Sequence, residues 1–375
     1  MDWKRNITIT TNVSCNLNCI YCYENKNSNH SFNVDNAKIR LSNLLSQRSG
    51  GGTTISFHGG EPFLVYDKIK ELCEWLWDQH FPEPYRCFAT TNGTLIHGDL
   101  QNWLYNNRKR FICSLSLDGN RQMQNINRSK SFDLIDISFF TQTWPTQGIK
   151  MTISPQTIST LSEGIIFLHK LGISDIRANL SEMTDWNDKQ LLSIFNTELN
   201  KLSDYYIDNP HIKPCSIFRV PFFKILEKAP IKKWCGIGET PAYDIDSNIV
   251  YPCHLFFPSV CGKEKSDSIK TIDFINPQTY VSEHCSACAF LRICPTCYGA
   301  NFIERGHPSS RDMNLCKYQK VRFLKVAEFE FKRINAIINS DDCNIDISTR
   351  RRYYMTIEGI KHITPQLNDV ESKCI

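Results

Sequence analysis

Long apolar runs are missing from this chain of 375 residues. No run approaches the roughly 20 consecutive apolar residues that a membrane-spanning helix needs, so we expect no membrane partner. The first residues (MDWKRNITIT) also lack the apolar segment of a secretory signal peptide. Together these absences favour a cytoplasmic protein.

A strong charge of one sign is missing as well. The net charge is +4, from 43 Lys and Arg against 39 Asp and Glu, which is too weak and too scattered to indicate a nucleic-acid partner. We find neither a repeat of the solenoid kind nor a low-complexity tract. With 41% hydrophobic and 22% charged residues, the composition is that of a globular protein. The length favours two domains.

Cysteine, in contrast, is abundant, with 17 residues. In a reducing compartment, clustered cysteines more often ligate metals than form disulfides. Ten of them fall into spaced groups, described below. We expect the other seven to be small core residues or surface thiols: Cys73, Cys87, Cys113, Cys215, Cys261, Cys343 and Cys374.

The first half alternates between strand-like and helix-like segments. Strands are predicted at 7–10, 53–57, 86–91, 111–117, 149–153 and 173–179, and helices at 33–48, 66–80, 97–107, 131–142, 159–171 and 187–206. Such alternation indicates an α/β protein with a parallel sheet or an open barrel. Periodicity is poor over 235–316. The tail, 317–375, begins as a charged helix and ends as a polar stretch with little pattern.

Three cysteines, Cys15, Cys19 and Cys22, follow the first predicted strand with the spacing C-x3-C-x2-C. Three thiolates can hold three irons of a [4Fe–4S] cube and leave the fourth iron open to a small molecule. The alternatives are a structural zinc loop or inert thiols. Polar motifs also end the next three strands: GGEP at 59–62, TNG at 91–93 and SLDG at 116–119. In β/α folds, ligands bind at these carboxyl ends of the strands.

CNLNCIYC, GGEP, TNG and SLDG together resemble the radical S-adenosylmethionine (SAM) enzymes, in particular those with a C-terminal SPASM domain. The resemblance implies a partial (β/α)6 TIM-like barrel and a C-terminal iron–sulfur domain. The implied domains are a radical SAM partial barrel (1–205), a connecting segment (206–234), a SPASM domain (235–325) and a C-terminal helix and tail (326–375).

The resemblance also implies roles in the first half. Cys15, Cys19 and Cys22 would ligate the SAM-binding [4Fe–4S] cluster, and Glu61 would pair with the SAM ammonium. An electron from the cluster would cleave SAM to methionine and a 5′-deoxyadenosyl radical, which abstracts hydrogen from the substrate. Tyr21 would place an aromatic face near the adenine of SAM, and Gly59 with Gly60 would allow close approach of the backbone. Ser116 would contact the ribose, Arg128 the carboxylate of SAM, and Leu180 the adenine.

The later cysteines resemble the seven-cysteine SPASM signature. Cys285, Cys288, Cys294 and Cys316 would hold one auxiliary [4Fe–4S] cluster, and Cys235, Cys253 and Cys297 a second, with an open iron or a fourth ligand from Cys215 or Cys261. The third gap of the central block is one residue shorter than usual, and Asn248 stands where the family has Gly. Asn tolerates a left-handed turn, so that change is mild. A zinc ribbon is the alternative.

SPASM enzymes mostly modify peptides or proteins, and two reactions compete. One is maturation of a ribosomal peptide by crosslinking or epimerisation; the other is anaerobic sulfatase maturation, which forms formylglycine. In the second family an Asp follows the second SPASM cysteine, where this chain has His254. His254 could act as a base, but the difference favours the first reaction. The expected partners are a precursor peptide or protein and an electron donor such as flavodoxin or ferredoxin. A non-catalytic, metal-stabilised binding module is the alternative of another class.

Overall fold

The computed structural model describes residues 2–26, 31–228, 233–338 and 345–374. The chain divides into two units by its internal contacts. Unit 1 comprises Met1–Met151 and Gly236–Ile275, and unit 2 comprises Thr152–Cys235 and Asn276–Ile375. This division differs from the four predicted domains, whose boundaries remain predictions. None of the helices in the described ranges is long and apolar enough to cross a membrane.

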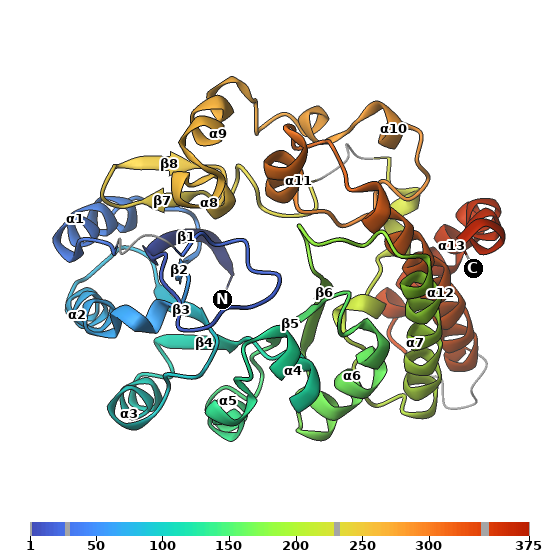
Figure 1. The fold of residues 1–375 in the computed structure, drawn as a ribbon, viewed down its shortest axis with the longest axis horizontal. Helices are drawn as coiled ribbons and strands as arrows, with labels where there is room; N and C mark the ends of the chain where they lie inside the picture. Colours follow the sequence, from blue (N-terminus) through green and yellow to red (C-terminus); the bar gives the residue numbers. More distant parts are fainter. Residues whose placement is uncertain (1, 27–30, 229–232, 339–344, 375) are drawn as a thin grey trace. The chain divides into compact units, whose positions relative to one another are not determined.

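Unit 1 is built on a sheet with the strand order β4-β3-β2-β1-β7-β8 (Figure 1). Its strands are β1 (Trp3–Asn12), β2 (Gly52–Gly59), β3 (Tyr85–Thr91), β4 (Phe111–Leu115), β7 (Ala242–Asp244) and β8 (Ile249–Tyr251). Neighbouring strands are parallel except β7 and β8, which form an antiparallel hairpin. In one row of the register, Ile7 lies opposite Ile55, and Ile55 opposite Cys87. All three side chains are buried, so the row forms part of the core.

Helices connect the strands of unit 1. They are α1 (Val34–Leu45), α2 (Tyr66–Trp77), α3 (Gly98–Asn106), α4 (Arg121–Asn127) and α5 (Ile137–Thr143), with the short α8 (Pro258–Cys261) and α9 (Lys263–Ser268) after the hairpin. Asn33 caps α1 by accepting from the Asn36 N–H, as capping residues do. Figure 1 shows α1, α2 and α3 along the same side of the sheet. Helices α1, α2 and α3 each bring the chain back to start another parallel strand.

Strand β5 (Ile149–Ile153) follows α5 and contains the boundary between the units. In unit 1, Ser116 forms a parallel bridge with Lys150, and the Leu117 N–H donates to the Lys150 carbonyl at 2.9 Å. In unit 2, β6 (Ile176–Leu180) forms a two-stranded sheet with β5, and the Ser181 N–H donates to the Ile153 carbonyl at 2.8 Å. The six predicted strands are therefore present, and the α/β class with parallel strands is confirmed.

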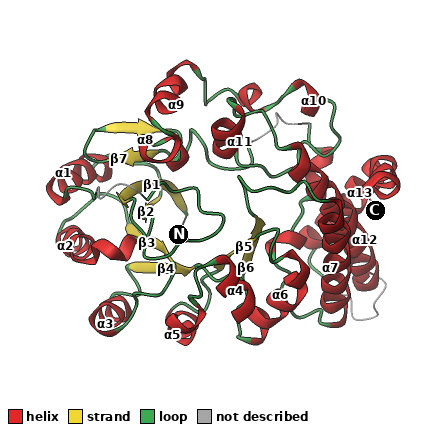
Figure 2. Cartoon of the chain, in the orientation of Figure 1, coloured by secondary structure: helices red, strands yellow, loops and turns green. Residues whose placement is uncertain are grey.

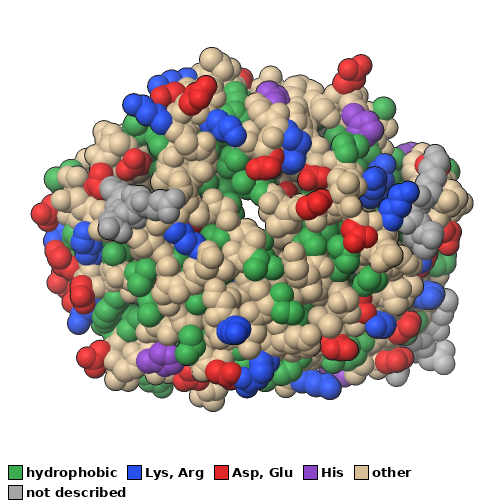
Figure 3. Space-filling view, in the orientation of Figure 1, with side chains coloured by type: hydrophobic (Ala, Val, Ile, Leu, Met, Phe, Trp, Pro, Cys, Tyr) green, Lys and Arg blue, Asp and Glu red, His purple; other side chains and the backbone are tan. Residues whose placement is uncertain are grey.

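Unit 2 is mainly helical (Figure 2). Its longer helices are α6 (Leu161–Lys170), α7 (Lys189–Asp208), α11 (Tyr298–Arg305), α12 (Met313–Ile338) and α13 (Ile347–Cys374), and α10 (Glu283–Ser286) is a single turn. The segment around the later cysteines consists of short helices and turns, as expected from its poor periodicity. Figure 3 shows acidic and basic side chains interspersed on the face that it displays.

The polar tail is the clearest correction in the fold. We expected little pattern at the end of the chain, but α13 is a helix of 28 residues. It buries a stripe at helical spacing: Ile357, Ile360, Ile363, Leu367 and Val370. A Cβ on Gly359 would lie 2.2 Å from the Phe222 carbonyl oxygen, so the glycine lets α13 approach the 3-10 helix Phe222–Leu226. The apolar stripe was readable in the sequence but is diluted by many charges.

Candidate active site and cluster sites

The three early cysteines lie in the loop that follows β1. Burial raises the pKa of Cys19 to about 11, and repulsion from the thiols of Cys22 and Cys15 adds to this, while Arg128 opposes it. The three thiols are thus close enough to interact electrostatically. The Leu17 N–H donates to the Cys15 sulfur at 3.4 Å, and the Asn92 side chain lies 3.8 Å from the same sulfur.

The glycines of GGEP have a structural task that the sequence did not indicate. A Cβ on Gly59 would lie 2.1 Å from the Asn12 carbonyl oxygen, and one on Gly60 would lie 2.1 Å from that of Ser14. Both contacts are with backbone that cannot move aside like a side chain. The two glycines therefore let the end of β2 pack against the start of the cysteine loop. Their predicted approach to SAM stays a prediction.

Glu61 follows these glycines and is buried, with 1% of its surface exposed. Its carboxylate accepts from the Thr91 hydroxyl and the Asn92 N–H, each at 2.8 Å, and from the Phe63 N–H at 3.3 Å. Burial raises the pKa of Glu61 to about 7 although these donors oppose the shift. Within the described ranges it forms no ion pair, so the site offers a buried carboxylate to a cation.

Asp118 connects the end of the β4 segment to the cysteine loop. It is fully buried, accepts from the Tyr21 hydroxyl and from the Asn127 amide at 3.1 Å, and pairs with the Arg128 guanidinium at 2.9 Å. The Ile20 N–H also donates to the Asn127 carbonyl at 3.0 Å. The SLDG motif indicated only that Asp118 follows a strand, and nothing in the sequence pointed to this buried network.

Two predicted SAM contacts, Tyr21 and Arg128, belong to this network. The Arg128 guanidinium lies 5.4 Å from the centre of the Tyr21 ring, and it is engaged by Asp118. Ser116 is buried at the end of β4, where its N–H donates to the Thr91 carbonyl at 2.9 Å. Leu180 ends β6 in unit 2 and is also buried. Contacts of these four residues with SAM remain predictions.

His254 lies in unit 1 directly after Cys253. Its Nε2 is 2.9 Å from the Tyr23 hydroxyl, and its ring centre is 4.0 Å from that of His58. Burial, with a smaller contribution from Lys150, lowers the pKa of His254 to about 4. His97 contacts the Leu134 carbonyl at 3.0 Å, whereas His58 Nδ1 is buried without a hydrogen-bond partner among the described residues.

Four later cysteines come together in unit 2. Burial raises the pKa of Cys294 to about 12; Arg311 opposes this, and the thiols of Cys316, Cys288 and Cys285 add to it. These are the four predicted ligands of one auxiliary cluster. They come from α10, the following turns and the first turn of α12.

The second predicted set is only partly assembled within one unit. Burial raises the pKa of Cys297 to about 12, with smaller increases from Glu182 and Cys235. Cys297 and Cys235 belong to unit 2, whereas Cys253 belongs to unit 1, so their joint ligation remains a prediction. Asn248 has φ +60°, the left-handed conformation predicted for the position where the family has Gly.

The scattered cysteines mostly agree with their expected role. Cys73, Cys87, Cys113 and Cys215 are buried in the cores, whereas Cys261 is partly exposed. Cys215 donates through its N–H to the Tyr206 hydroxyl at 3.0 Å. Cys343 and the side chain of Cys374 lie outside the described residues.

The donor chemistry fits an iron–sulfur cube at the first site. Among the described residues, no three His, Cys, Asp or Glu side chains converge on a point where a single metal ion would bind. Thiolates on a cube each ligate a different iron, so convergence on one point is not required. The neighbouring buried carboxylate of Glu61 fits the ammonium group of SAM.

Comparisons with known proteins agree with this chemistry. Residues 9–134 match the radical SAM superfamily. An uncharacterized protein of Methanocaldococcus jannaschii is 24% identical over 64% of this chain and 80% of its own length. A cysteine-type anaerobic sulfatase-maturating enzyme of Clostridium perfringens is 30% identical, but over only 30% of this chain and 32% of that enzyme.

Solved structures share the fold. Native anSMEcpe with bound AdoMet matches with a TM-score of 0.66 at 18% identity and covers 89% of this chain and 100% of its own. SuiB of Streptococcus suis, bound to its precursor peptide SuiA, matches with a TM-score of 0.54 at 17% identity and covers 84% and 76%. Both matches extend well beyond residues 9–134, so the likeness in fold includes most of the second half. The chain is therefore similar to the radical SAM superfamily over residues 9–134, and it shares the fold of the solved structures over most of its length.

Proposed function

We propose that this chain modifies a peptide by radical SAM chemistry, giving a crosslinked or otherwise altered ribosomal peptide. One observation carries the first step. Glu61 presents a buried carboxylate, held by three donors and free of ion pairs within the described ranges, beside the loop of Cys15, Cys19 and Cys22. A charge-assisted hydrogen bond to the SAM ammonium would satisfy this carboxylate.

The residues divide the work at this site. The three cysteines hold the cluster, and Glu61 orients SAM through its ammonium group. Ser116, Arg128, Leu180 and Tyr21 complete the SAM pocket by resemblance. When bound, the cluster supplies the electron that cleaves SAM, and the resulting radical removes a hydrogen atom from the substrate. The buried Asp118 network keeps the cysteine loop in place while this happens.

We assign the later cysteines to a SPASM domain with two auxiliary clusters. Cys285, Cys288, Cys294 and Cys316 support this assignment because the four thiols lie together. Cys297 with Cys235, joined by Cys253, would hold the second cluster. Electrons would come from a small carrier such as flavodoxin or ferredoxin.

A peptide substrate is supported by what the structural neighbours bind. SuiB was solved with its precursor peptide SuiA, and anSMEcpe with the Cp18Cys peptide. His254 would take the proton that leaves the substrate, because its lowered pKa keeps the imidazole neutral and its Nε2 contacts Tyr23. Formylglycine formation is the second candidate, favoured by the likeness to anSMEcpe. His254 in place of the Asp of that family argues against it.

The test uses the full chain, reconstituted with iron and sulfide under argon and reduced with dithionite in the presence of SAM. We expect 5′-deoxyadenosine from the native protein and none from the variant in which Cys15, Cys19 and Cys22 are Ala. SAM cleavage by that variant would refute the site assignment.

The substrate is tested by mass spectrometry with two peptides. One is encoded beside the gene, and the other is a cysteine peptide taken from a sulfatase. Loss of two hydrogens from the first peptide indicates a crosslink. A mass that is unchanged in ordinary water but increases in deuterated water, through uptake of deuterium, indicates epimerisation. Conversion of the second alone to formylglycine would favour the second candidate. His254→Asn should suppress product while 5′-deoxyadenosine still forms.

A further inference from the structure

Arg311 lies beside one of the four cysteines that come together in unit 2. Its Nη1 is 3.1 Å from the Cys294 sulfur, within hydrogen-bond distance for a charged donor. Its Nε is buried and has no hydrogen-bond partner among the described residues. A small cavity is lined by Arg311 together with Cys294 and Cys316, and also by Glu182 and Asp312. A guanidinium with one donor on a sulfur and a second, buried donor unused is suited to an anionic group at this place.

A second guanidinium, that of Arg322, is buried and interacts electrostatically with the same cysteine. Arg322 is 6% exposed, and it donates to the Ile217 carbonyl at 2.6 Å and to the Ser216 carbonyl at 3.0 Å. These partners satisfy its donors but bring no negative charge, and no carboxylate of the described residues pairs with it. Burial lowers the pKa of Arg322 to about 10, and the nearby Cys215 and Cys294 oppose this shift.

The charge balance favours a thiolate cluster over four free thiols. Neutral thiols would leave the buried Arg322 without a compensating charge, which is costly. Arg311 is partly exposed and shares its cavity with the carboxyl groups of Glu182 and Asp312. Four thiolates around an iron–sulfur cube carry a net negative charge that both cations would offset. Arg311, through its direct contact with Cys294, is the one placed to act on the cluster's electronic properties.

We propose that Arg311 is a positioning residue that raises the reduction potential of the cluster held by Cys285, Cys288, Cys294 and Cys316. The inference rests on the auxiliary cluster assigned under the proposed function. Reduction brings one electron from a low-potential carrier and makes the cluster more negative by one charge. A cation that donates a hydrogen bond to a ligating sulfur stabilises the reduced form more than the oxidised form. The result is a better electron acceptor.

The experiment is a redox titration of the reconstituted full chain, followed by electron paramagnetic resonance with dithionite as reductant. The signal that disappears in Cys288→Ala identifies the cluster. At the native midpoint, Arg311→Met should lower the reduced-to-oxidised ratio about tenfold, which for one electron is a decrease of about 59 mV. Arg311→Lys should fall between the two, because it keeps the charge but loses the planar donor geometry.

Arg333→Met is the matched control. Arg333 lies in the same helix as Cys316, about 25 Å along its axis, and pairs with Glu330 at 2.6 Å. This substitution removes the same charge from the same unit, so the midpoint potential of the cluster should equal the native value. Iron content should be the same in the native protein and in the Arg311 and Arg333 variants, which separates a tuned cluster from a lost one.

Two results would overturn the inference. The first is a fully occupied cluster in Arg311→Met with the native midpoint. If Arg311→Met fails to assemble the cluster, Arg311→Gln replaces it, because Gln keeps an N–H donor without the charge. A native midpoint potential in Arg311→Gln would then be the second result that refutes the role of Arg311. A native protein with no iron beyond the first cluster would instead refute the auxiliary cluster itself, and iron analysis distinguishes that case.

Discussion

The Glu61 N–H donates to the Ser14 carbonyl at 2.8 Å, which ties the residue predicted to bind SAM directly to the cysteine loop. The GGEP motif therefore contacts the cysteine loop through its backbone, while the Glu61 side chain is left for the proposed SAM pocket. The pairing depends on the glycines before Glu61, because any Cβ there would meet the backbone of the loop. The predicted cluster site and the predicted SAM site are thus joined through the backbone.

Replacing Gly60 by Ala should therefore destabilise unit 1 and disturb the cluster. The added Cβ would overlap the Ser14 carbonyl oxygen, and overpacking of this kind costs up to about 3 kcal/mol. Urea unfolding of the reconstituted protein measures the loss. Gly50→Ala is the control, because its Cβ would face open space and only its left-handed backbone is strained. Equal effects of the two substitutions would contradict the close packing described here.

Glu61→Gln should weaken SAM binding while the cluster still assembles. The substitution preserves shape but removes the charge, and a hydrogen bond to a charged group contributes about 1.5–3 kcal/mol, or roughly 10- to 150-fold in affinity. Equilibrium dialysis under argon gives the dissociation constant. Glu71→Gln is the control, because Glu71 is an exposed partner of Lys38. Native SAM affinity in Glu61→Gln would remove Glu61 from the pocket.

The raised pKa of Glu61 also predicts a pH dependence of stability in the absence of SAM. Its pKa rises from 4.5 to about 7 on folding, so the folded state holds the proton more tightly. Stability should therefore fall as pH rises from about 4.5 through about 7, by an amount on the order of 3 kcal/mol. Glu61→Gln should flatten this part of the profile in denaturant unfolding. A profile with the native slope in that variant would assign the dependence to another group.

Asp118→Asn should be strongly destabilising because it leaves the Arg128 guanidinium buried without its counter-ion. Removing one partner of a buried pair costs about 3–5 kcal/mol. The exposed pair of Arg121 and Asp133 supplies the control, and Asp133→Asn should cost less than about 1 kcal/mol. Denaturant midpoints of the reconstituted proteins test both. Similar small losses would mean that the Asp118 network does not hold the cysteine loop.

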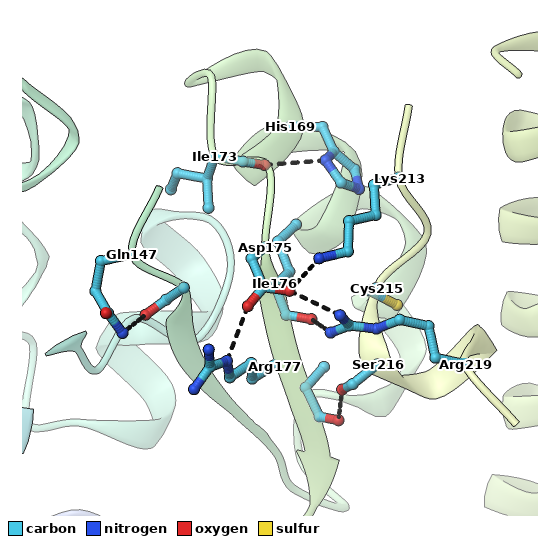
Figure 4. Close-up of polar contacts among 12 residues, drawn as sticks. Gln147, His169, Ile173, Asp175, Ile176, Arg177, Lys213, Cys215, Ser216 and Arg219 are labelled. Atoms are coloured by element: carbon cyan, nitrogen blue, oxygen red, sulfur yellow. Dashed lines mark hydrogen bonds and ion pairs between the residues drawn. The ribbon is translucent and has the colours of Figure 1, made fainter. Parts of the chain in front are cut away.

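In unit 2, Asp175 is paired with three cations, Arg177, Lys213 and Arg219, as Figure 4 shows. Hydrogen bonds from these cations lower the pKa of Asp175 despite its partial burial. Asp175→Asn should cost about 1 kcal/mol at neutral pH, and less in 1 M salt, which screens exposed pairs. Asp204→Asn, an exposed change in the same unit, is the control for urea unfolding. A cost that is independent of salt would contradict an electrostatic origin.

Sequence patterns were sufficient for the elements with a strong period. The strands around Ile7, Ile55 and Cys87 lie where alternation and β-branched residues predicted them, because their burial leaves a clear hydrophobic signal. Helix α4 and the hairpin β7–β8 were missed. Each is short, and the hairpin exposes Ile249 and Val250, so neither leaves a period that can be counted.

The candidate site shows the same division. The cysteine spacing and GGEP predict the cluster and SAM ligands from their chemistry, without knowledge of the fold. The partners of His254 could not be predicted, because Tyr23, His58 and His254 come from three distant parts of the chain and meet only in the folded sheet. Arg311 escaped notice for a related reason: the approach of its guanidinium to Cys294 depends on the turn between α11 and α12.

The neighbours of β1 have a consequence for biosynthesis. β1 pairs on one side with β2, but its other neighbour, β7, aligns Tyr243 with Ile9. A ribosome that adds about 5–20 residues per second needs on the order of ten seconds or more to deliver that partner. Until then the nascent chain carries an open strand edge next to the thiols that are predicted to bind iron, so protection from aggregation and from premature metal capture would have to precede completion of the sheet.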